Sequence, residues 1–194
     1  MSTLRRGIPS HAKKVFAGKI FEVWQWEQKM FDGGVEIFER LRRPNTAQVI
    51  AVVGDKILAQ TEEQPDSTQP FSSLPGGRCD ADEDPLVAAK RELFEETGYV
   101  SDDWVLWKEV NPVSKIEWTV YTFIARNCVY QQEPHVDSGE KITSKPVSFD
   151  DFLTLSDDPF FYSPELVSHM LRLRLNKQEK EKFRQALFVG NPIS

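Results

Sequence analysis

The chain has 194 residues, a length typical of one domain with a sizeable core, and its formal net charge of -6 at pH 7 excludes a general affinity for nucleic-acid backbones or anionic membranes. No stretch reaches the roughly 20 apolar residues needed to span a bilayer, and the segment from Met1 to Lys14 lacks the apolar core of a signal peptide. The cysteines, Cys79 and Cys128, have no metal-ligand spacing and exclude a zinc or disulfide framework, so we expect a cytoplasmic protein.

The first predicted element is a β-hairpin. Val15 to Lys29 is rich in β-branched and aromatic residues, which favour an extended strand. Asp32-Gly33-Gly34 then offers the positive-φ positions of a tight turn, before a second apolar run from Val35 to Leu41.

A second hairpin is predicted from Gln48–Val53 and Lys56–Gln60, joined across Gly54-Asp55. The first of these strands is almost wholly apolar, so we expect it to be buried on both faces. Glu62 to Gln69 is polar and contains a proline, which predicts a surface loop leading into a short strand at Phe71–Leu74.

One helix is predicted after Pro75-Gly76-Gly77, which ends the preceding strand. Asp82 or Asp84 can cap a helix that begins at Pro85, and Gly98 can end it. Helical spacing predicts two apolar ridges that pack on a sheet, Leu86 with Leu93 and Val87 with Phe94.

The remainder of the chain predicts two strands and then helices. The strands are Trp104–Val110 and Ile116–Ala125, and Ser148 can cap a short amphipathic helix that reaches Leu155. Two further helices are expected at Pro164–Leu175 and Lys177–Leu187. This order of elements favours an α+β fold with helices on the faces of a sheet.

A constellation of charged residues lies on and before the predicted helix. It reads Gly77, five residues, Glu83, seven residues, Arg91-Glu92-Leu93, one residue, Glu95-Glu96, one residue, Gly98-Tyr99. Helical spacing places the carboxylates of Glu92, Glu95 and Glu96 on one face of the helix. Like charges at these spacings cost roughly 0.2 to 0.5 kcal/mol per pair, and Arg91 offsets only part of this repulsion. A hard cation such as Mg²⁺ or Mn²⁺ would remove the conflict, can bridge to substrate phosphates, and activates a bound water. An arbitrary run of Glu is usually a solvated face, but the fixed spacing favours a metal platform.

This constellation resembles the box of the Nudix hydrolase family, with Tyr99 where an aliphatic residue is commoner. The resemblance implies a Nudix-type α/β/α sandwich with a mixed β-sheet and an N-terminal β-hairpin extension. It also implies Mg²⁺, with Mn²⁺ as an alternative, held by Glu92, Glu95, Glu96 and the Gly76 carbonyl, and a supporting role for Glu83 and Arg91. Gly76 and Gly77 permit a phosphate or a metal to approach the main chain closely.

Weaker cues over residues 15 to 175 resemble the ADP-ribose or nucleotide-sugar pyrophosphatase branch: Phe16-Ala-Gly-Lys-Ile-Phe21, a following strand, and Leu-Arg-Arg-Pro before the second hairpin. The resemblance implies that residues 1–44 form N-terminal strands that build a homodimer, and that residues 45–194 form the Nudix domain with C-terminal helices. Two departures from the pattern of this branch weaken ADP-ribose as the specific substrate. Many ADP-ribose hydrolases have a proline about sixteen residues beyond the box, and Pro112 lies before that position. The loop after Glu63-Gln64 also lacks the arginine that often follows there.

Candidate substrate contacts are the aromatic residues Trp24, Trp26 and Trp118, whose rings can stack on a base, and Gly77 in the phosphate loop. Ordinary packing remains open for each ring. Glu140 is either a catalytic carboxylate on a loop that Gly139 allows to move or a solvated side chain, whereas His135 is expected to be incidental.

The predicted function is hydrolysis of the diphosphate of a nucleoside diphosphate linked to a sugar or ribose, yielding a nucleoside monophosphate and a sugar phosphate. The alternatives are hydrolysis of dinucleoside polyphosphates or nucleoside triphosphates, and a nucleotide-sensing module without turnover. The predicted partner is a small nucleotide, with neither nucleic acid nor a membrane.

Overall fold

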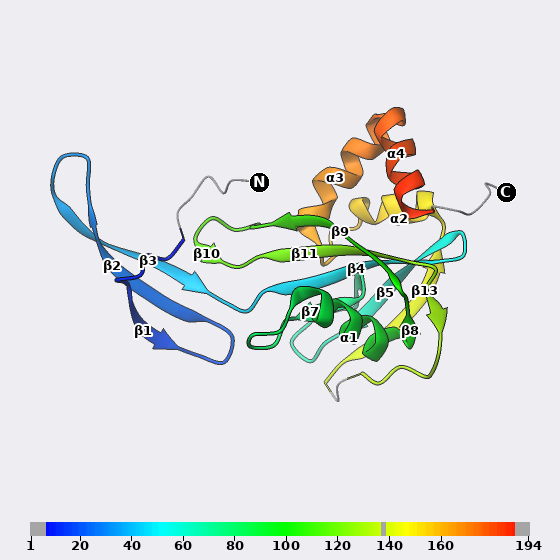
Figure 1. Cartoon of the computed structure of the whole chain (residues 1–194), viewed down its shortest axis with the longest axis horizontal. Coiled ribbons are helices and arrows are strands. Elements are labelled where there is room, and N and C mark those ends of the chain that lie inside the picture. Colours follow the sequence, from blue (N-terminus) through cyan, green and yellow to red (C-terminus); the bar gives the residue numbers. More distant parts are fainter. Residues whose placement is uncertain (1–6, 137–138, 189–194) are drawn as a thin grey trace.

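The computed structural model describes residues 7–136 and 139–188, and within them a β-stranded arm projects from a central sheet that carries the helices (Figure 1). The arm is a four-stranded sheet in the order β1-β2-β3-β10. Its first three strands are antiparallel and β10 joins β3 in parallel. The bounds are β1 (Lys13–Ala17), β2 (Glu22–Lys29), β3 (Val35–Arg42) and β10 (Ile116–Glu117).

The arm corrects one prediction and confirms another. The single strand expected over Val15–Lys29 is two antiparallel strands, because the chain reverses between them, where the Gly18 N–H donates to the Phe21 carbonyl at 2.8 Å. The turn at Asp32-Gly33-Gly34 forms as predicted, with Gly33 at φ 90°.

The central sheet has seven strands and is mixed. Its main order is β13-β5-β4-β11-β9, with β6 paired to β5 and β7 paired to β4. β4 and β11 are parallel, while the other pairs are antiparallel. The inner residues of β4 are buried on both faces, as predicted. The bounds are β4 (Thr46–Val53), β5 (Lys56–Glu63), β6 (Phe71–Ser73), β7 (Gly76–Arg78), β9 (Asp103–Val110), β11 (Val120–Arg126) and β13 (Lys141–Val147).

Helices cover both faces of this sheet, which confirms the α+β sandwich. Alternate residues of β4 separate two core clusters: Val49 packs with α1, and Ile50 packs with α2, α3 and α4. α1 begins after the Asp84 cap and ends at Gly98, which has φ 71°. The bounds are α1 (Pro85–Thr97), α2 (Phe149–Thr154), α3 (Pro164–Leu175) and α4 (Lys177–Leu187), with a 3-10 turn η1 (Leu155–Asp157) and a small pair β8 (Tyr99–Val100) and β12 (Val129–Tyr130).

Several other strand predictions were wrong. The strand expected over Ile116–Ala125 is broken at Trp118-Thr119, where the chain passes from the arm to the central sheet and the Thr119 N–H bonds to the Asn45 side chain. β13 was missed because its lysines and proline hide the strand pattern, and a proline is tolerated there since β13 is an edge strand. One prediction about α1 was also wrong: Val87 was expected in an apolar ridge packed on the sheet, but it is 54% exposed.

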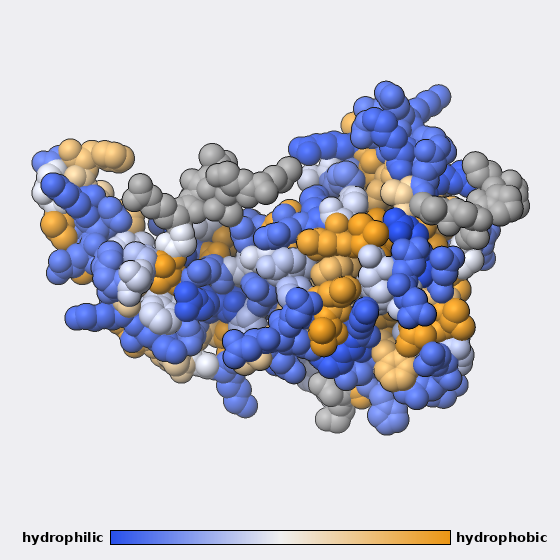
Figure 2. Space-filling view, viewed as in Figure 1, coloured by the Kyte–Doolittle hydropathy of each residue, from blue (hydrophilic) through white to orange (hydrophobic). Residues whose placement is uncertain are grey.

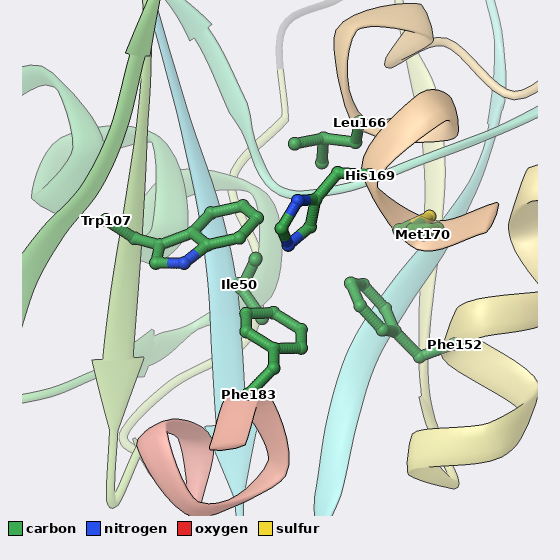
Figure 3. A pocket seen from close by; sticks show the side chains of 7 residues that line it. All are labelled: Ile50, Trp107, Phe152, Leu166, His169, Met170 and Phe183. Carbon is green, nitrogen blue, oxygen red and sulfur yellow. The ribbon is translucent and has the colours of Figure 1, made fainter. Parts of the chain in front are cut away.

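The core between the sheet and α3 and α4 is closely packed. His169 lies there with its ring 4.8 Å from that of Trp107, and burial lowers the pKa of its imidazole (Figure 3). The apolar gap among these side chains is too small to hold a water molecule, so this region is part of the packed core and not a binding pocket.

The surface is mostly hydrophilic on the face in Figure 2, with apolar groups on the arm and over the central sheet. On the arm, Phe31 is fully exposed and Phe16 and Ile37 are more than half exposed. Within residues 7–136 and 139–188, we find no helix long and apolar enough to cross a membrane.

Candidate active site

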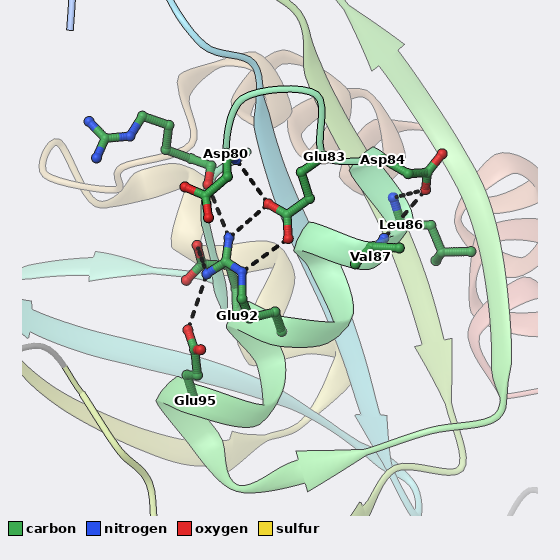
Figure 4. A network of polar contacts seen from close by, with 9 residues as sticks. Asp80, Glu83, Asp84, Leu86, Val87, Glu92 and Glu95 are labelled. Atoms are coloured by element: carbon green, nitrogen blue, oxygen red, sulfur yellow. Dashed lines mark hydrogen bonds and ion pairs between the residues drawn. The ribbon is translucent and has the colours of Figure 1, made fainter. Parts of the chain in front are cut away.

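Glu83 and Arg91 hold the loop before α1 against the helix. Arg91 grips Glu83 with two parallel hydrogen bonds, Nε to Oε1 at 3.1 Å and Nη2 to Oε2 at 3.0 Å (Figure 4). Glu83 also accepts from the Asp80 N–H, and the Arg91 guanidinium lowers the pKa of the Glu83 carboxyl. This bidentate geometry is a strong charge-assisted interaction, so it gives the loop a defined shape.

The same guanidinium reaches the other carboxylates of the helix. Its Nη1 donates to Glu92 at 2.9 Å and to Glu95 at 3.1 Å, and its Nη2 donates to the Arg78 carbonyl at 3.2 Å. These carboxylates, Glu83 foremost, raise the pKa of Arg91. One cation therefore offsets part of the charge of three carboxylates.

Glu92 lies directly against the glycine loop. A Cβ atom on Gly77 would come within 2.5 Å of the Glu92 carboxylate oxygen, so a larger residue there would displace the carboxylate. Burial raises the pKa of Glu92, although Arg91 acts in the opposite direction. The glycine allows the main chain to approach a carboxylate closely.

Glu96 is the most buried of these carboxylates, with 7% exposure. Its Oε2 accepts from the Gly76 N–H and from Gln60 Nε2, both at 3.0 Å. Burial raises the pKa of Glu96 well above its ordinary value. Gly76 is required at its position, because a Cβ would lie 2.3 Å from the Ala47 carbonyl oxygen.

The donor chemistry of this face fits a hard divalent cation, since it consists of carboxylate oxygens beside a half-buried glycine backbone. The arrangement is not a preformed cage: within 7–136 and 139–188, no three acidic, histidine or cysteine side chains converge as a metal cluster. Arg91 binds Glu92 and Glu95 instead, while Glu96 is held by neutral donors. A cation would therefore compete with Arg91 for two of the three carboxylates.

Glu140 lies at the same site, immediately before β13. Burial raises the pKa of both Glu62 and Glu92, and the negative charge of Glu140 raises each of them further. His135 is exposed, and its N–H donates to the Glu95 carbonyl at 2.6 Å, which is a main-chain contact.

Glu62 is a carboxylate that sequence reasoning missed. It was assigned to a surface loop, but β5 extends through Glu63 and Glu62 is only 7% exposed. The available signal was the alternation of strand side chains, which places Leu58, Gln60 and Glu62 on one face.

The three candidate tryptophans lie in different surroundings. Trp26 is 9% exposed, and Phe38 packs against its ring, so little of it is open to a ligand. Arg42 lies 4.7 Å from the ring of Trp24. Trp118 donates to the Thr46 hydroxyl, and the Arg43 guanidinium lies 4.5 Å from its ring.

Arg43 and Arg78 form a cationic group that sequence analysis did not select. Burial lowers the pKa of Arg43, Tyr162 acts in the opposite direction, and the positive charge of Arg78 lowers it again. Among the described residues, the buried Nε of Arg43 has no hydrogen-bond partner. Arg78 directly follows the glycine loop, and its carbonyl accepts from Arg91 on the carboxylate face.

Comparisons with known proteins agree with this geometry. The model of the NUDIX domain family matches residues 42–166. A methanol dehydrogenase activator of Bacillus methanolicus is 22% identical over 174 residues, covering 88% of this chain and 94% of that protein. An ADP-ribose pyrophosphatase of Bacillus subtilis (strain 168) is also 22% identical over 174 residues, covering 85% of this chain and 91% of that protein.

The fold is shared with a solved structure of an ADP compounds hydrolase, with a TM-score of 0.72, 20% identity, and coverage of 95% of this chain and 100% of that chain. The family match spans more than half of the chain and includes the whole glycine loop and α1. The chain therefore belongs to the NUDIX domain family and is a Nudix hydrolase that acts on phosphoric anhydride bonds.

Proposed function

We propose that this chain is a divalent-metal-dependent pyrophosphohydrolase that splits the diphosphate of ADP-ribose or a related nucleoside diphosphate sugar. The products are a nucleoside monophosphate and a sugar phosphate. The observation that carries the proposal is the meeting of Glu92 and Glu96 with the Gly76-Gly77 backbone on one face of α1. The ADP-ribose pyrophosphatase and the ADP compounds hydrolase among the similar proteins favour this substrate class.

Glu92, Glu95 and Glu96, with the Gly76 carbonyl, would hold Mg²⁺ or Mn²⁺. When bound, such an ion supplies charge neutralisation at the diphosphate and lowers the pKa of a coordinated water. Burial raises the pKa of Glu92 and Glu96, in Glu92 against the opposing effect of Arg91, and a divalent cation would stabilise the charged form of both carboxylates. The donor set and its electrostatics both support the proposed metal dependence.

The protein residues have separate roles in the proposed reaction. Arg91 keeps the loop in place through Glu83, and its pairs with Glu92 and Glu95 would give way to a bound cation. Glu140 accepts a proton from the water whose oxygen attacks phosphorus. The bridging P–O bond breaks, and its electron pair leaves with the departing phosphate, which is then protonated from solvent.

The nucleotide is proposed to lie along Arg78, Arg43 and Trp118. Two guanidinium groups complement the negative charge of a diphosphate. Trp118 offers a ring for stacking on a base. Trp24 is a second proposed stacking residue, whereas the burial of Trp26 favours a packing role.

The proposed assembly is a homodimer formed through the N-terminal strands, with residues 1–44 as the dimerisation element and 45–194 as the Nudix domain. The exposed Phe16, Phe31 and Ile37 on the projecting arm support it, because such apolar side chains commonly mark an interface. Sedimentation analysis checks it. We propose a cytoplasmic location on the two buried free thiols, Cys79 and Cys128.

The deciding experiment is a substrate panel assayed with Mg²⁺ and with Mn²⁺, followed by product analysis. ADP-ribose and nucleotide sugars should give a monophosphate and a sugar phosphate without inorganic pyrophosphate. Preference for triphosphates with pyrophosphate release, or for dinucleoside polyphosphates, would replace the proposed substrate class. Tight calorimetric binding of nucleotides with no turnover would identify a sensing module instead.

A further inference from the structure

Gln60 on β5 is a buried amide that contacts the most buried carboxylate of the site. Its side chain is 2% exposed, and it lies on the α1 face of the strand with Leu58 and Glu62. A buried amide is costly unless its hydrogen bonds are satisfied, so its partners determine its orientation.

The contacts of Gln60 join four elements. Nε2 donates to Glu96 Oε2 on α1 at 3.0 Å and to the Ser144 hydroxyl on β13 at 3.4 Å. Oε1 accepts from the Ser73 hydroxyl on β6 at 3.2 Å. The reverse amide orientation would place Oε1 against the Glu96 carboxylate, which is repulsive, so Ser73 and Glu96 together select the observed one.

Glu62 fixes Ser73 in turn. The Ser73 hydroxyl lies within hydrogen-bond distance of both Gln60 Oε1 and Glu62 Oε1 and shares its one proton between them, while Gln64 Nε2 donates to Glu62 Oε2 at 3.4 Å. Ser73 and Glu62 are 3% and 7% exposed, so this part of the network is buried between β5 and β6. The orientation of Gln60 therefore depends on a neighbouring strand.

We propose that Gln60 is a positioning residue that holds Glu96 for metal binding and hydrolysis, an inference that rests on the proposed function. Gln60 and the Gly76 N–H both donate to Oε2, so these two contacts hold one oxygen of the carboxylate and leave Oε1 for a cation. Partners that orient metal-binding carboxylates in this way affect metal affinity or activity by about 10–100-fold.

The test compares Gln60→Met with Gln48→Met. Methionine keeps the length and volume of glutamine without its hydrogen bonds. Gln48 is a matched control because it is 5% exposed on the adjacent strand β4 and bonds to Thr122 and Glu165 on the opposite face of the sheet. We expect Gln60→Met to lower kcat about 10–100-fold and to raise the half-saturating metal concentration similarly, with less than a threefold change in substrate KM.

A second readout is Mn²⁺ affinity measured by electron paramagnetic resonance without substrate. Gln60→Met should bind Mn²⁺ at least tenfold more weakly than Gln48→Met. Thermal unfolding is the control and should show that both variants are folded. Ser73→Ala should give a smaller loss, and adding it to Gln60→Met should cause no further loss, because both changes act through one amide.

The two proposals fail in different ways. If the wild-type protein hydrolyses none of the panel compounds, the proposed function is wrong, and Mn²⁺ affinity alone then decides the role of Gln60. Equal kcat and equal Mn²⁺ affinity in Gln60→Met and Gln48→Met would overturn that role even in an active enzyme. If Gln60→Met does not fold, the same comparisons on Ser73→Ala decide it: a loss of Mn²⁺ affinity supports the role, and wild-type affinity overturns it.

Discussion

Replacing Glu96 with Gln distinguishes the contribution of the carboxylate to kcat from its effect on the stability of the fold. The substitution removes the charge and keeps the shape, and the new side-chain carbonyl can still accept from Gln60 and the Gly76 N–H. We expect kcat to fall by about 10²–10⁴-fold, the range for loss of a group that acts directly on the reaction. The fold should be preserved.

The same substitution should stabilise the metal-free protein. Making the acceptor neutral weakens two hydrogen bonds by about 1 kcal/mol each. Burial of the carboxylate, which is 7% exposed, costs several kcal/mol, and this cost disappears. A net gain of about 1–2 kcal/mol would raise Tm by roughly 2–8 °C for a domain of this size.

The gain should depend on pH with a defined sign. Because burial raises the pKa of folded Glu96 above its unfolded value, the folded wild type binds more protons in this range and loses stability as pH rises. The difference in Tm between Glu96→Gln and wild type should therefore be absent below the ordinary pKa of a glutamate and grow as pH rises toward the folded pKa. Calorimetry in a chelator across this pH range measures it.

Two outcomes would refute this reasoning. Near-normal metal-dependent turnover of Glu96→Gln would show that the carboxylate is not part of the reaction centre. A lower Tm in the metal-free variant at neutral pH would show that the buried charge is compensated by contacts other than those to Gln60 and Gly76.

Three further substitutions test other parts of the site. Arg91→Lys loses the bidentate grip on Glu83, so kcat should fall about 10–100-fold and urea unfolding should show lower stability; unchanged values would contradict its role. Gly77→Ala places a Cβ atom 2.5 Å from the Glu92 carboxylate, so steady-state assays should show at least a roughly tenfold lower kcat, while the control Gly34→Ala on the arm stays close to wild type. Trp118→Ala should raise substrate KM by about tenfold with little effect on kcat, since base stacking contributes about 1–3 kcal/mol; an unchanged KM would remove Trp118 from the binding site.

Local features were predicted well because their causes are local. α1 was placed between Pro85 and Gly98 from its cap, its N-terminal proline and its terminal glycine, and the structure confirms each. The bounds of α3 and α4 were also correct. The spacing of the carboxylates on α1 follows from the helical repeat, so their proximity needed no knowledge of the tertiary structure.

Strand boundaries and strand partners were predicted less well, because an extended segment is defined by its neighbours across the sheet. The runs Val15–Lys29 and Ile116–Ala125 look continuous in sequence, yet each is divided between strands with different partners. β7 and β13 were missed for the same reason, since they are strands only where β4 and β5 pair with them.

The sequence by itself determined the helix that carries the acidic face, the glycine loop before it and the family, because these depend on residue types at short, fixed spacings. Only the tertiary structure decided which oxygens each carboxylate presents and what holds them. Arg91 pairs with Glu92 and Glu95, whereas Gln60, distant in sequence, binds Glu96. The physical reason is that burial and hydrogen-bond partners arise where separate elements pack together, and those long-range contacts are not encoded in any local repeat.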